Sequence, residues 1–186
     1  MMLLARAGST RSRLMAIRAQ VHLHHGKVTV YSRKGINWTK EFRRIASAAE
    51  KLKVRDAIID GEAVVYGVTG LPDFQALRRE LGARNSGALR YHAFDLLYLD
   101  GRDVRQLPYV QRKAQLQQLL KGVPETLIYV EYLEADGARV FEHACKMGLE
   151  GIVAKRRDSV YRSGRSDAWL KLKMQEERHI PESSLS

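Results

Sequence analysis

The chain has 186 residues, and 45% of them are hydrophobic, which is enough apolar material for one domain with a sizeable core. A formal net charge of +11 and a pI of about 9.9 favour polyanionic partners such as nucleic acid or nucleotide phosphates. The lone cysteine, Cys145, excludes a disulfide framework and a cysteine-built metal site, and it fits a reducing compartment. No apolar run approaches the roughly 20 residues of a membrane-spanning helix, so we expect a soluble protein without a membrane partner.

The first part of the chain predicts a leader and then a β-hairpin. Residues 1–16 are rich in arginine and lack acidic side chains, and the first acidic residue is Glu41. Organelle transit peptides have this composition, but we interpret the segment as an unstructured or altered leader. A hairpin is expected around the turn residues His25 and Gly26, and its second strand ends at SRKG. The alternating apolar residues of its two strands are Val21, Leu23, Val28 and Val30.

A helix and a buried strand are expected next. Thr39 can cap the helix, because a threonine hydroxyl accepts hydrogen bonds from the free N–H groups of a first turn. Apolar residues then follow at helical spacing and share one face: Phe42, Ile45, Ala49 and Leu52. The run AIIDGEAVV, residues 57–65, predicts a buried strand.

Turn and cap signals divide the middle of the chain. Asp73 can cap a short helix that ends at Gly82, and residues 89–101 predict a long strand that closes in an Asp-Gly turn. Pro108 opens a further helix, which Gly122 stops. Four residues of this helix are expected to share one face: Tyr109, Lys113, Leu116 and Leu120.

Extended structure resumes at Leu127, and a last helix runs from a cap at Asp136 to Gly148 before the strands GIVAK, residues 151–155, and WLKLK, residues 169–173. Strands and helices are mixed without the steady alternation of a doubly wound sheet. The fold class that this order favours is α+β, with antiparallel β-sheets flanked by helices.

Charged residues inside these apolar strands need partners, because an unpaired buried charge is costly. They are Glu62, Asp95, Glu150, Lys171 and Lys173. We expect them to meet one another or a ligand. Two lysines at i and i+2 point to the same side of a strand, which suits them to a run of phosphates. A carboxylate near such phosphates is suited to holding a divalent ion.

Five separated motifs occur in one order and spacing. They are SRKG at 32–35, IDGE at 59–62, HAFDLLYLDG at 92–101, EGIVAKRRDSVYRSGRS at 150–166 and WLKLK at 169–173. Together they closely resemble the nucleotidyltransferase domain of ATP-dependent DNA ligases, especially the ligase module of bacterial end-joining enzymes. The resemblance covers residues 17–173, and it leaves residues 1–16 as an unmatched leader and residues 174–186 as a polar tail. It implies a nucleotidyltransferase (ATP-grasp-like) adenylation domain.

The resemblance also implies roles around an ATP molecule. Glu62 would hydrogen-bond the ribose, and Phe94 would stack on the adenine ring. Arg18 and Arg33 would add positive charge near nucleotide and DNA phosphates. The structural alternative for Phe94 is plain core packing. Alternatives also stand for the cations of residues 155–157, as a solvated face, and for the histidines of HLHH, as residues that bind no metal.

Around the phosphates of ATP, the resemblance implies that Lys171 and Lys173 contact the phosphate groups and that Glu150 holds a magnesium or manganese ion. The partner that it implies is nicked or broken duplex DNA, together with other end-joining proteins. The implied location is the bacterial cytoplasm, in association with the nucleoid.

The chain departs from this family at the nucleophile. Such ligases attack ATP with the lysine of a K-x-D-G motif, which is followed by an aromatic residue, an arginine and a glutamine. Here Ile17, Arg18 and Gln20 stand where that tail belongs, but the lysine, aspartate and glycine positions hold Arg13, Met15 and Ala16. Arginine cannot replace the lysine, because its guanidinium stays protonated and has no free lone pair for attack on phosphorus.

The match stops abruptly before Ile17, and we interpret the leader as a replacement sequence, with Met15 as a possible true initiator. Family members also carry an oligonucleotide-binding β-barrel after WLKLK, whereas MQEERHIPESSLS is too short for one. We therefore expect poor encirclement of a nick, and we expect complete ligation to need a second polypeptide.

The sequence favours a DNA-ligase relative that binds ATP and DNA but does not adenylate itself. Three alternatives stay open. The chain seals only ends that already carry AMP, it binds nucleotide or nicked DNA without catalysis, or it belongs to the RNA-ligase or capping branch of the superfamily.

Overall fold

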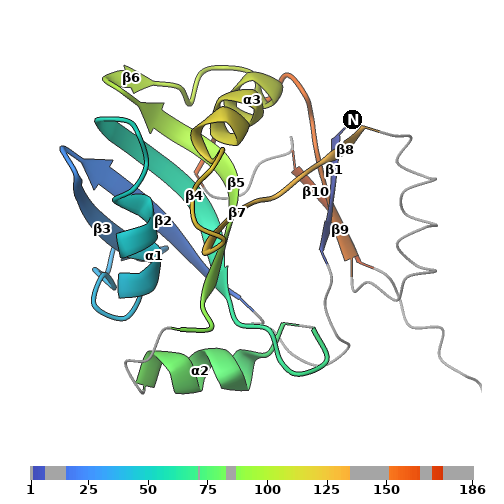
Figure 1. Ribbon diagram of the computed structural model, residues 1–186. Helices are drawn as coiled ribbons and strands as arrows, with labels where there is room; N and C mark the ends of the chain where they lie inside the picture. Colours follow the sequence, from blue (N-terminus) through green and yellow to red (C-terminus); the bar gives the residue numbers. More distant parts are fainter. Residues whose placement is uncertain are drawn as a thin grey trace, which may run out of the picture.

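The computed structural model describes residues 2–6, 16–70, 72–82, 87–134, 151–163 and 169–173, and these residues form two β-sheets and three helices (Figure 1). The larger sheet has the order β3-β2-β4-β5-β6, and β7 pairs with β5. Its strands are β2 (Ile17–His24), β3 (Lys27–Ser32), β4 (Asp56–Val64), β5 (Arg90–Leu99), β6 (Arg102–Asp103) and β7 (Leu127–Tyr129). Only the β5–β7 pair is parallel among the described ladders. The predicted α+β class is confirmed, with one parallel pair in an otherwise antiparallel arrangement.

The predicted hairpin joins β2 to β3. His25 and Gly26 both have positive φ, 46° and 77°, which is the backbone of a two-residue type I′ turn. Such a turn matches the right-handed twist of the strands it connects. The predicted turn residues are therefore confirmed, and the register that follows places Ala19 opposite Ser32 and Val21 opposite Val30.

Helix α1 (Arg43–Ala49) begins later than the sequence suggests. The expected cap at Thr39 is wrong, because the N-cap is Phe42 and the Thr39 hydroxyl is engaged elsewhere. It accepts a hydrogen bond from the backbone N–H of Val30 at 3.0 Å and donates to Asn37 Oδ1 at 2.6 Å. Thr39 thus ties the segment before the helix to β3. The predicted apolar face is right, since all four of its residues are buried.

The other two helices follow their start signals. Asp73 accepts the backbone N–H of Ala76 at 2.9 Å and caps α2 (Phe74–Gly82), as predicted. Helix α3 (Tyr109–Leu119) follows Pro108 and packs against β5. The core lies between the larger sheet and the helices. It includes Ile45 from α1, Ile59 from β4, Leu96 from β5 and Leu116 from α3.

The register of β4 against β5 shifts at two places, and the shift between Asp60 and Gly61 is described here as a β-bulge. Gly61 is opposite Ala93 and Asp60 is opposite Asp95, so Phe94 is the extra residue on β5. Gly61 is required here, because a Cβ at this position would lie 2.5 Å from the Tyr91 ring and 2.6 Å from the carbonyl oxygen of His92. In the bulge, Phe94 and Asp95 together occupy the place of one residue opposite Asp60.

Asp95 has a buried arginine as its partner. Arg112 of α3 donates to its two carboxylate oxygens at 2.8 and 3.1 Å, and neither side chain has any exposed surface. Asp95 was expected to meet Glu62, Glu150, Lys171, Lys173 or a ligand, and its partner in the structure is instead an arginine outside that set. The sequence did not identify Arg112. The neighbouring Lys113, for which only a shared helix face was predicted, is also buried, and its ammonium lies 3.8 Å from the centroid of the Tyr129 ring.

The smaller sheet has the order β10-β9-β1-β8. It contains β1 (Met2–Arg6), β8 (Leu133–Glu134), β9 (Gly151–Lys155) and β10 (Trp169–Lys173). The last two strands confirm the prediction. The interpretation of residues 1–16 as unstructured is wrong for residues 2–6, which pair with both β8 and β9. The helix expected from Asp136 to Gly148 lies outside the described residues.

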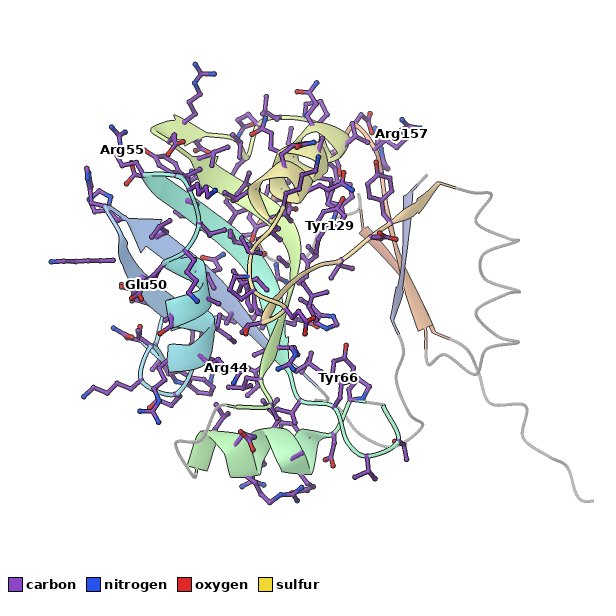
Figure 2. All side chains as sticks on the ribbon, in the orientation of Figure 1. Arg44, Glu50, Arg55, Tyr66, Tyr129 and Arg157 are labelled. Carbon is purple, nitrogen blue, oxygen red and sulfur yellow. The ribbon has the colours of Figure 1, made fainter. Side chains whose placement is uncertain are left out.

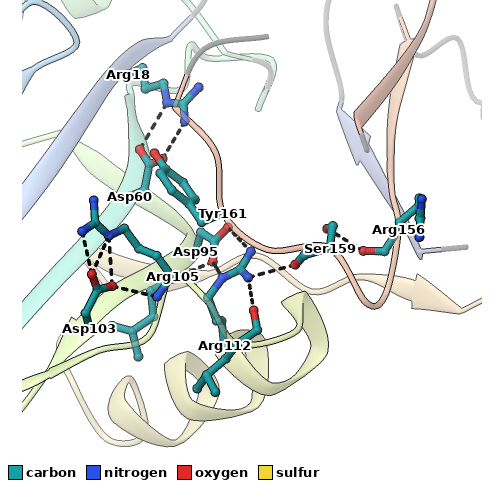
Figure 3. Close-up of polar contacts among 11 residues, drawn as sticks. Arg18, Asp60, Asp95, Asp103, Arg105, Arg112, Arg156, Ser159 and Tyr161 are labelled. Atoms are coloured by element: carbon teal, nitrogen blue, oxygen red, sulfur yellow. Dashed lines mark hydrogen bonds and ion pairs between the residues drawn. The ribbon is translucent and has the colours of Figure 1, made fainter. Parts of the chain in front are cut away.

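Residues 156–162, here called the crossing segment, lead from β9 to the larger sheet and α3 (Figure 3). The backbone carbonyl of Arg157 accepts the N–H of Val110 at 3.2 Å, and the N–H of Tyr161 donates to the carbonyl of Arg105 at 2.8 Å. Arg112 also donates to the carbonyl of Ser159 at 3.0 Å. Arg112 therefore connects β5, α3 and the crossing segment.

We predict that Arg112→Leu is strongly destabilising, because it leaves the Asp95 carboxylate buried without its cation. The expected loss of unfolding free energy is about 3–5 kcal/mol, measured by urea denaturation. Arg105→Leu is the matched control. Its side chain and that of its partner Asp103 are about half exposed, so the expected loss is about 0–1 kcal/mol. Equal losses in the two variants would contradict the importance of the buried pair.

Candidate functional site

Three of the predicted site residues come together on one face of the larger sheet. Side chains alternate along β4, so Glu62 points away from the face on which Ile59 and Ala63 join the core. Arg18 is opposite Glu62 in the register, and its guanidinium carbon lies 5.4 Å from the centroid of the Phe94 ring. All three side chains are half-buried. We call Arg18, Glu62 and Phe94 the candidate face.

A buried carboxylate lies under the candidate face. Asp60 has no exposed surface, and Arg18 donates to it from Nε at 3.2 Å and from Nη2 at 2.6 Å (Figure 3). Burial alone would lower the pKa of Arg18, but the hydrogen bonds and charge of Asp60 give a net rise. The guanidinium is therefore charged at neutral pH and held in one orientation.

Tyr161 of the crossing segment supplies a second partner for this carboxylate. Its hydroxyl donates to Asp60 Oδ2 at 2.9 Å. Burial, followed by the charge of Asp60, raises the pKa of Tyr161 to about 12, so the hydroxyl keeps its proton at neutral pH. Sequence reasoning assigned no role to Asp60 or Tyr161. The only available signal was their place inside two of the five motifs, IDGE and EGIVAKRRDSVYRSGRS.

His92 and Tyr66 extend the row of polar residues beyond Glu62. His92 is opposite Glu62 in the register, and its Nε2 lies 2.7 Å from the hydroxyl oxygen of Tyr66. Tyr66 follows β4, is 39% exposed, and lies near α2 at the end of the larger sheet (Figure 2). Sequence reasoning assigned no functional role to His92 or Tyr66.

Arg33 lies at the same end of the larger sheet as Arg18. It is exposed in the turn that follows β3, after Ser32, which is opposite Ala19. The turn is closed by a hydrogen bond from the N–H of Gly35 to the carbonyl of Ser32 at 2.9 Å, and Gly35 has a φ of 77°. The structure thus places Arg33 near the rim of the candidate face and not within it.

The predicted phosphate and metal residues belong to the smaller sheet or lie outside the described residues. Lys171 and Lys173 are in β10, opposite Val153 and Gly151, and the directions of their side chains are not described. Glu150 and Arg13 lie outside the described residues. Their predicted roles therefore stay predictions.

The described residues contain one group with metal-ligand chemistry, formed by His24, His25 and Asp56 at the hairpin turn. Their ligand atoms lie within 4.8 Å of one another. Asp56 is already engaged, because His24 Nδ1 lies 2.6 Å from one carboxylate oxygen and Arg55 Nε donates to the other at 2.6 Å. The hydrogen bond from Arg55 lowers the pKa of Asp56. An adjacent guanidinium repels cations, so we assign this group to support of the turn.

The chemistry of the candidate face fits a nucleoside with phosphates. A half-buried aromatic ring offers a surface on which a base can stack. A carboxylate accepts hydrogen bonds from sugar hydroxyls, and a guanidinium held by Asp60 presents its charge to an anion. Within the described parts of the chain, none of the helices has the length and apolar character needed to cross a membrane.

Comparison with known proteins identifies the family. The model for the ATP dependent DNA ligase domain matches residues 16–173. The multifunctional non-homologous end joining protein LigD of Pseudomonas aeruginosa is 37% identical over 164 residues, which cover 88% of this chain and 20% of the relative. The protein of the same name from Mycobacterium bovis is 39% identical over 155 residues, covering 83% and 20%. A DNA ligase of Thermococcus onnurineus is 32% identical, covering 84% and 30%.

Solved structures agree with this result. The crystal structure of the ligase domain from Mycobacterium tuberculosis LigD has a TM-score of 0.71 at 32% identity, and the match covers 92% of this chain and 53% of that one. A mycobacterial DNA ligase D complexed with ATP and MES has a TM-score of 0.70 at 32% identity, covering 91% and 58%. The chain spans about a fifth of the length of the LigD relatives. From these matches we conclude that the chain belongs to the ATP-dependent DNA ligase family and has the nucleotidyltransferase fold of that family's adenylation domain.

Proposed function

We propose that this chain binds ATP on the candidate face and does not form a covalent adenylate itself. The observation that carries the proposal is the convergence of Arg18, Glu62 and Phe94, with the guanidinium 5.4 Å from the ring centroid. Phe94 stacks on the adenine, Glu62 accepts hydrogen bonds from the ribose, and Arg18 faces the phosphates. The relative solved as a complex with ATP supports this choice of ligand.

A divalent ion, magnesium or manganese, belongs to the same proposal. It would spread the charge of the phosphates, with Glu150 as its protein ligand and Lys171, Lys173 and Arg33 as further cations. These assignments rest on the sequence motifs, and β10 places the two lysines two positions apart on one strand.

The identity of residue 13 is the reason for proposing that self-adenylation fails. Covalent transfer needs a neutral amine that attacks the α-phosphorus of ATP and displaces pyrophosphate. Arg13 stands at the position of the motif lysine, and its guanidinium has no free lone pair at neutral pH.

DNA is the proposed macromolecular partner. The net charge of +11 favours a polyanion, and the LigD relatives are named for non-homologous end joining. We therefore propose nicked or broken duplex DNA as the substrate and other end-joining proteins as further partners. We also propose the bacterial cytoplasm, in association with the nucleoid, as its location.

Sealing of ends that already carry AMP is a second candidate, favoured by the assembled candidate face. In that step a DNA 3′-hydroxyl oxygen attacks the 5′-phosphorus, the bond to AMP breaks, AMP leaves, and the hydroxyl proton passes to solvent. The step needs a nucleotide site and a metal but no nucleophilic lysine.

Loss of the Phe94 ring is expected to weaken ATP binding. Phe94→Leu should raise the Kd about tenfold in calorimetric titrations with Mg²⁺, because stacking on a base contributes about 1–3 kcal/mol. Tyr98→Leu is the matched control, since Tyr98 is a half-buried aromatic residue of the same strand on the far side of the bulge. An unchanged Kd in Phe94→Leu would argue against stacking on this ring.

Incubation with ATP labelled on its α-phosphate tests the missing nucleophile. After denaturing electrophoresis we expect no label on the chain. The companion variant Arg13→Lys, Met15→Asp, Ala16→Gly is expected to show weak labelling at most, because the residues around the restored motif still differ from the family pattern. Label retained by the unmodified chain would refute this part of the proposal.

Nicked DNA with a 5′-adenylate tests the second candidate. With Mg²⁺ or Mn²⁺ and no ATP, the unmodified chain is expected to join the strands, whereas Glu150→Ala is expected to lose this activity with its metal ligand. The yield of joined strand on a denaturing gel is the measurement. No joined strand above a protein-free control would leave noncatalytic binding of nucleotide or nicked DNA as the function, and equal joining by both proteins would refute the role of Glu150.

A further inference from the structure

A chain of hydrogen bonds runs from the crossing segment to the candidate face. Tyr161 donates to Asp60 Oδ2 at 2.9 Å, and Asp60 accepts two hydrogen bonds from Arg18 (Figure 3). The three residues come from the crossing segment, β4 and β2, and 101 positions separate Tyr161 from Asp60. The last member of this chain, Arg18, lies over the Phe94 ring.

We propose that Tyr161 is a positioning residue for the nucleotide site. Its hydroxyl fixes the orientation of the Asp60 carboxylate, and this carboxylate holds the Arg18 guanidinium over Phe94. The inference deepens the proposed function and rests on it for the effect on nucleotide binding.

Arg18 needs such support because it is long, flexible and partly in solvent. About a third of its side chain, 32%, is exposed, and an unrestrained arginine would lose rotamer freedom each time a ligand bound. The two-point contact with Asp60 removes that freedom in advance. A guanidinium held in this way is ready to meet an anion.

The Asp60 carboxylate in turn depends on its donors, because it has no exposed surface from which water can hydrate it. Rotation about its Cβ–Cγ bond would break the parallel contact with Arg18. Tyr161 and Arg18 Nη2 both donate to Oδ2, while Nε donates to Oδ1. The tyrosine hydroxyl therefore selects the carboxylate plane that gives Arg18 both of its hydrogen bonds.

Tyr161 acts through Asp60 and not on the ligand. Its side chain is buried, with 8% of the residue exposed, and its hydroxyl is committed to the carboxylate. The raised pKa, about 12, keeps the hydroxyl a donor over the physiological range. The backbone of Tyr161 is also fixed, because its N–H donates to the carbonyl of Arg105. Through the crossing segment, Tyr161 links the smaller sheet to the orientation of Arg18.

Tyr161→Phe tests the inference, because it removes the hydroxyl and keeps the ring. Ser159→Ala is the matched control. It removes a hydroxyl from the same segment that donates to the carbonyl of Arg156 at 2.7 Å and not to Asp60. The first readout is hydrogen exchange of the Arg18 Nε proton, followed by NMR in the nucleotide-free protein. We expect exchange to be about tenfold faster in Tyr161→Phe, equivalent to 1.4 kcal/mol, and unchanged in Ser159→Ala.

The second readout is the Kd for ATP with Mg²⁺, which we expect to rise about tenfold in Tyr161→Phe and to stay unchanged in Ser159→Ala. Unchanged Arg18 exchange in Tyr161→Phe would overturn the inference. Faster exchange with an unchanged Kd would overturn it as well, because Arg18 would then move without consequence for the nucleotide. If the unmodified chain does not bind ATP, the proposed function fails, while the Arg18 exchange still decides whether Tyr161 positions this side chain.

A second variant applies if Tyr161→Phe does not fold. Site-specific 3-fluorotyrosine at position 161 keeps the hydroxyl but makes it a stronger acid and a stronger donor. The Arg18 Nε–H resonance is then expected to shift. An unmoved resonance would overturn the inference.

Discussion

The structure depends on two buried carboxylates, each of which is paired with its own arginine. Asp60 and Asp95 are directly opposite each other on β4 and β5, and neither has exposed surface. Two like charges in this position repel each other and have lost their hydration, so each requires its own cation. Arg18 comes from β2 and Arg112 from α3. Because Arg112 also holds the crossing segment and Arg18 belongs to the candidate face, this constraint joins the packing of the fold to the geometry of the site.

Local signals in the sequence predicted turns and helix caps correctly where only neighbouring residues determine them. The turn at His25 and Gly26 and the cap at Asp73 depend on neighbouring residues only, and both predictions are confirmed. The cap at Thr39 was predicted by the same logic and is wrong, because a tertiary contact with Val30 uses the hydroxyl. Strand β1 was missed for a related reason. Its partners in β8 and β9 are more than a hundred residues away, and its own five residues show no alternating pattern.

The candidate site was predicted in part, and mainly through the resemblance of its motifs to a known family. Arg18, Glu62 and Phe94 were named from motif positions, and the register of β2, β4 and β5 brings them together. Asp60 and Tyr161 could not be found by spacing, since 101 residues separate these hydrogen-bond partners. Arg112 was missed because arginine on a helix is usually exposed, and only the position of Asp95 reveals why this one is buried.

The bulge at Phe94 has a consequence for how this strand tolerates changes in length. Phe94 is the unpaired residue of the bulge, so its deletion would place Asp95 directly after Ala93 while their partners Asp60 and Gly61 stay the same. The pairing would then be continuous at this point, but the strand would have lost the aromatic ring of the candidate face. The bulge therefore allows one residue of the candidate face to be inserted or removed without a change in the register of the rest of the sheet.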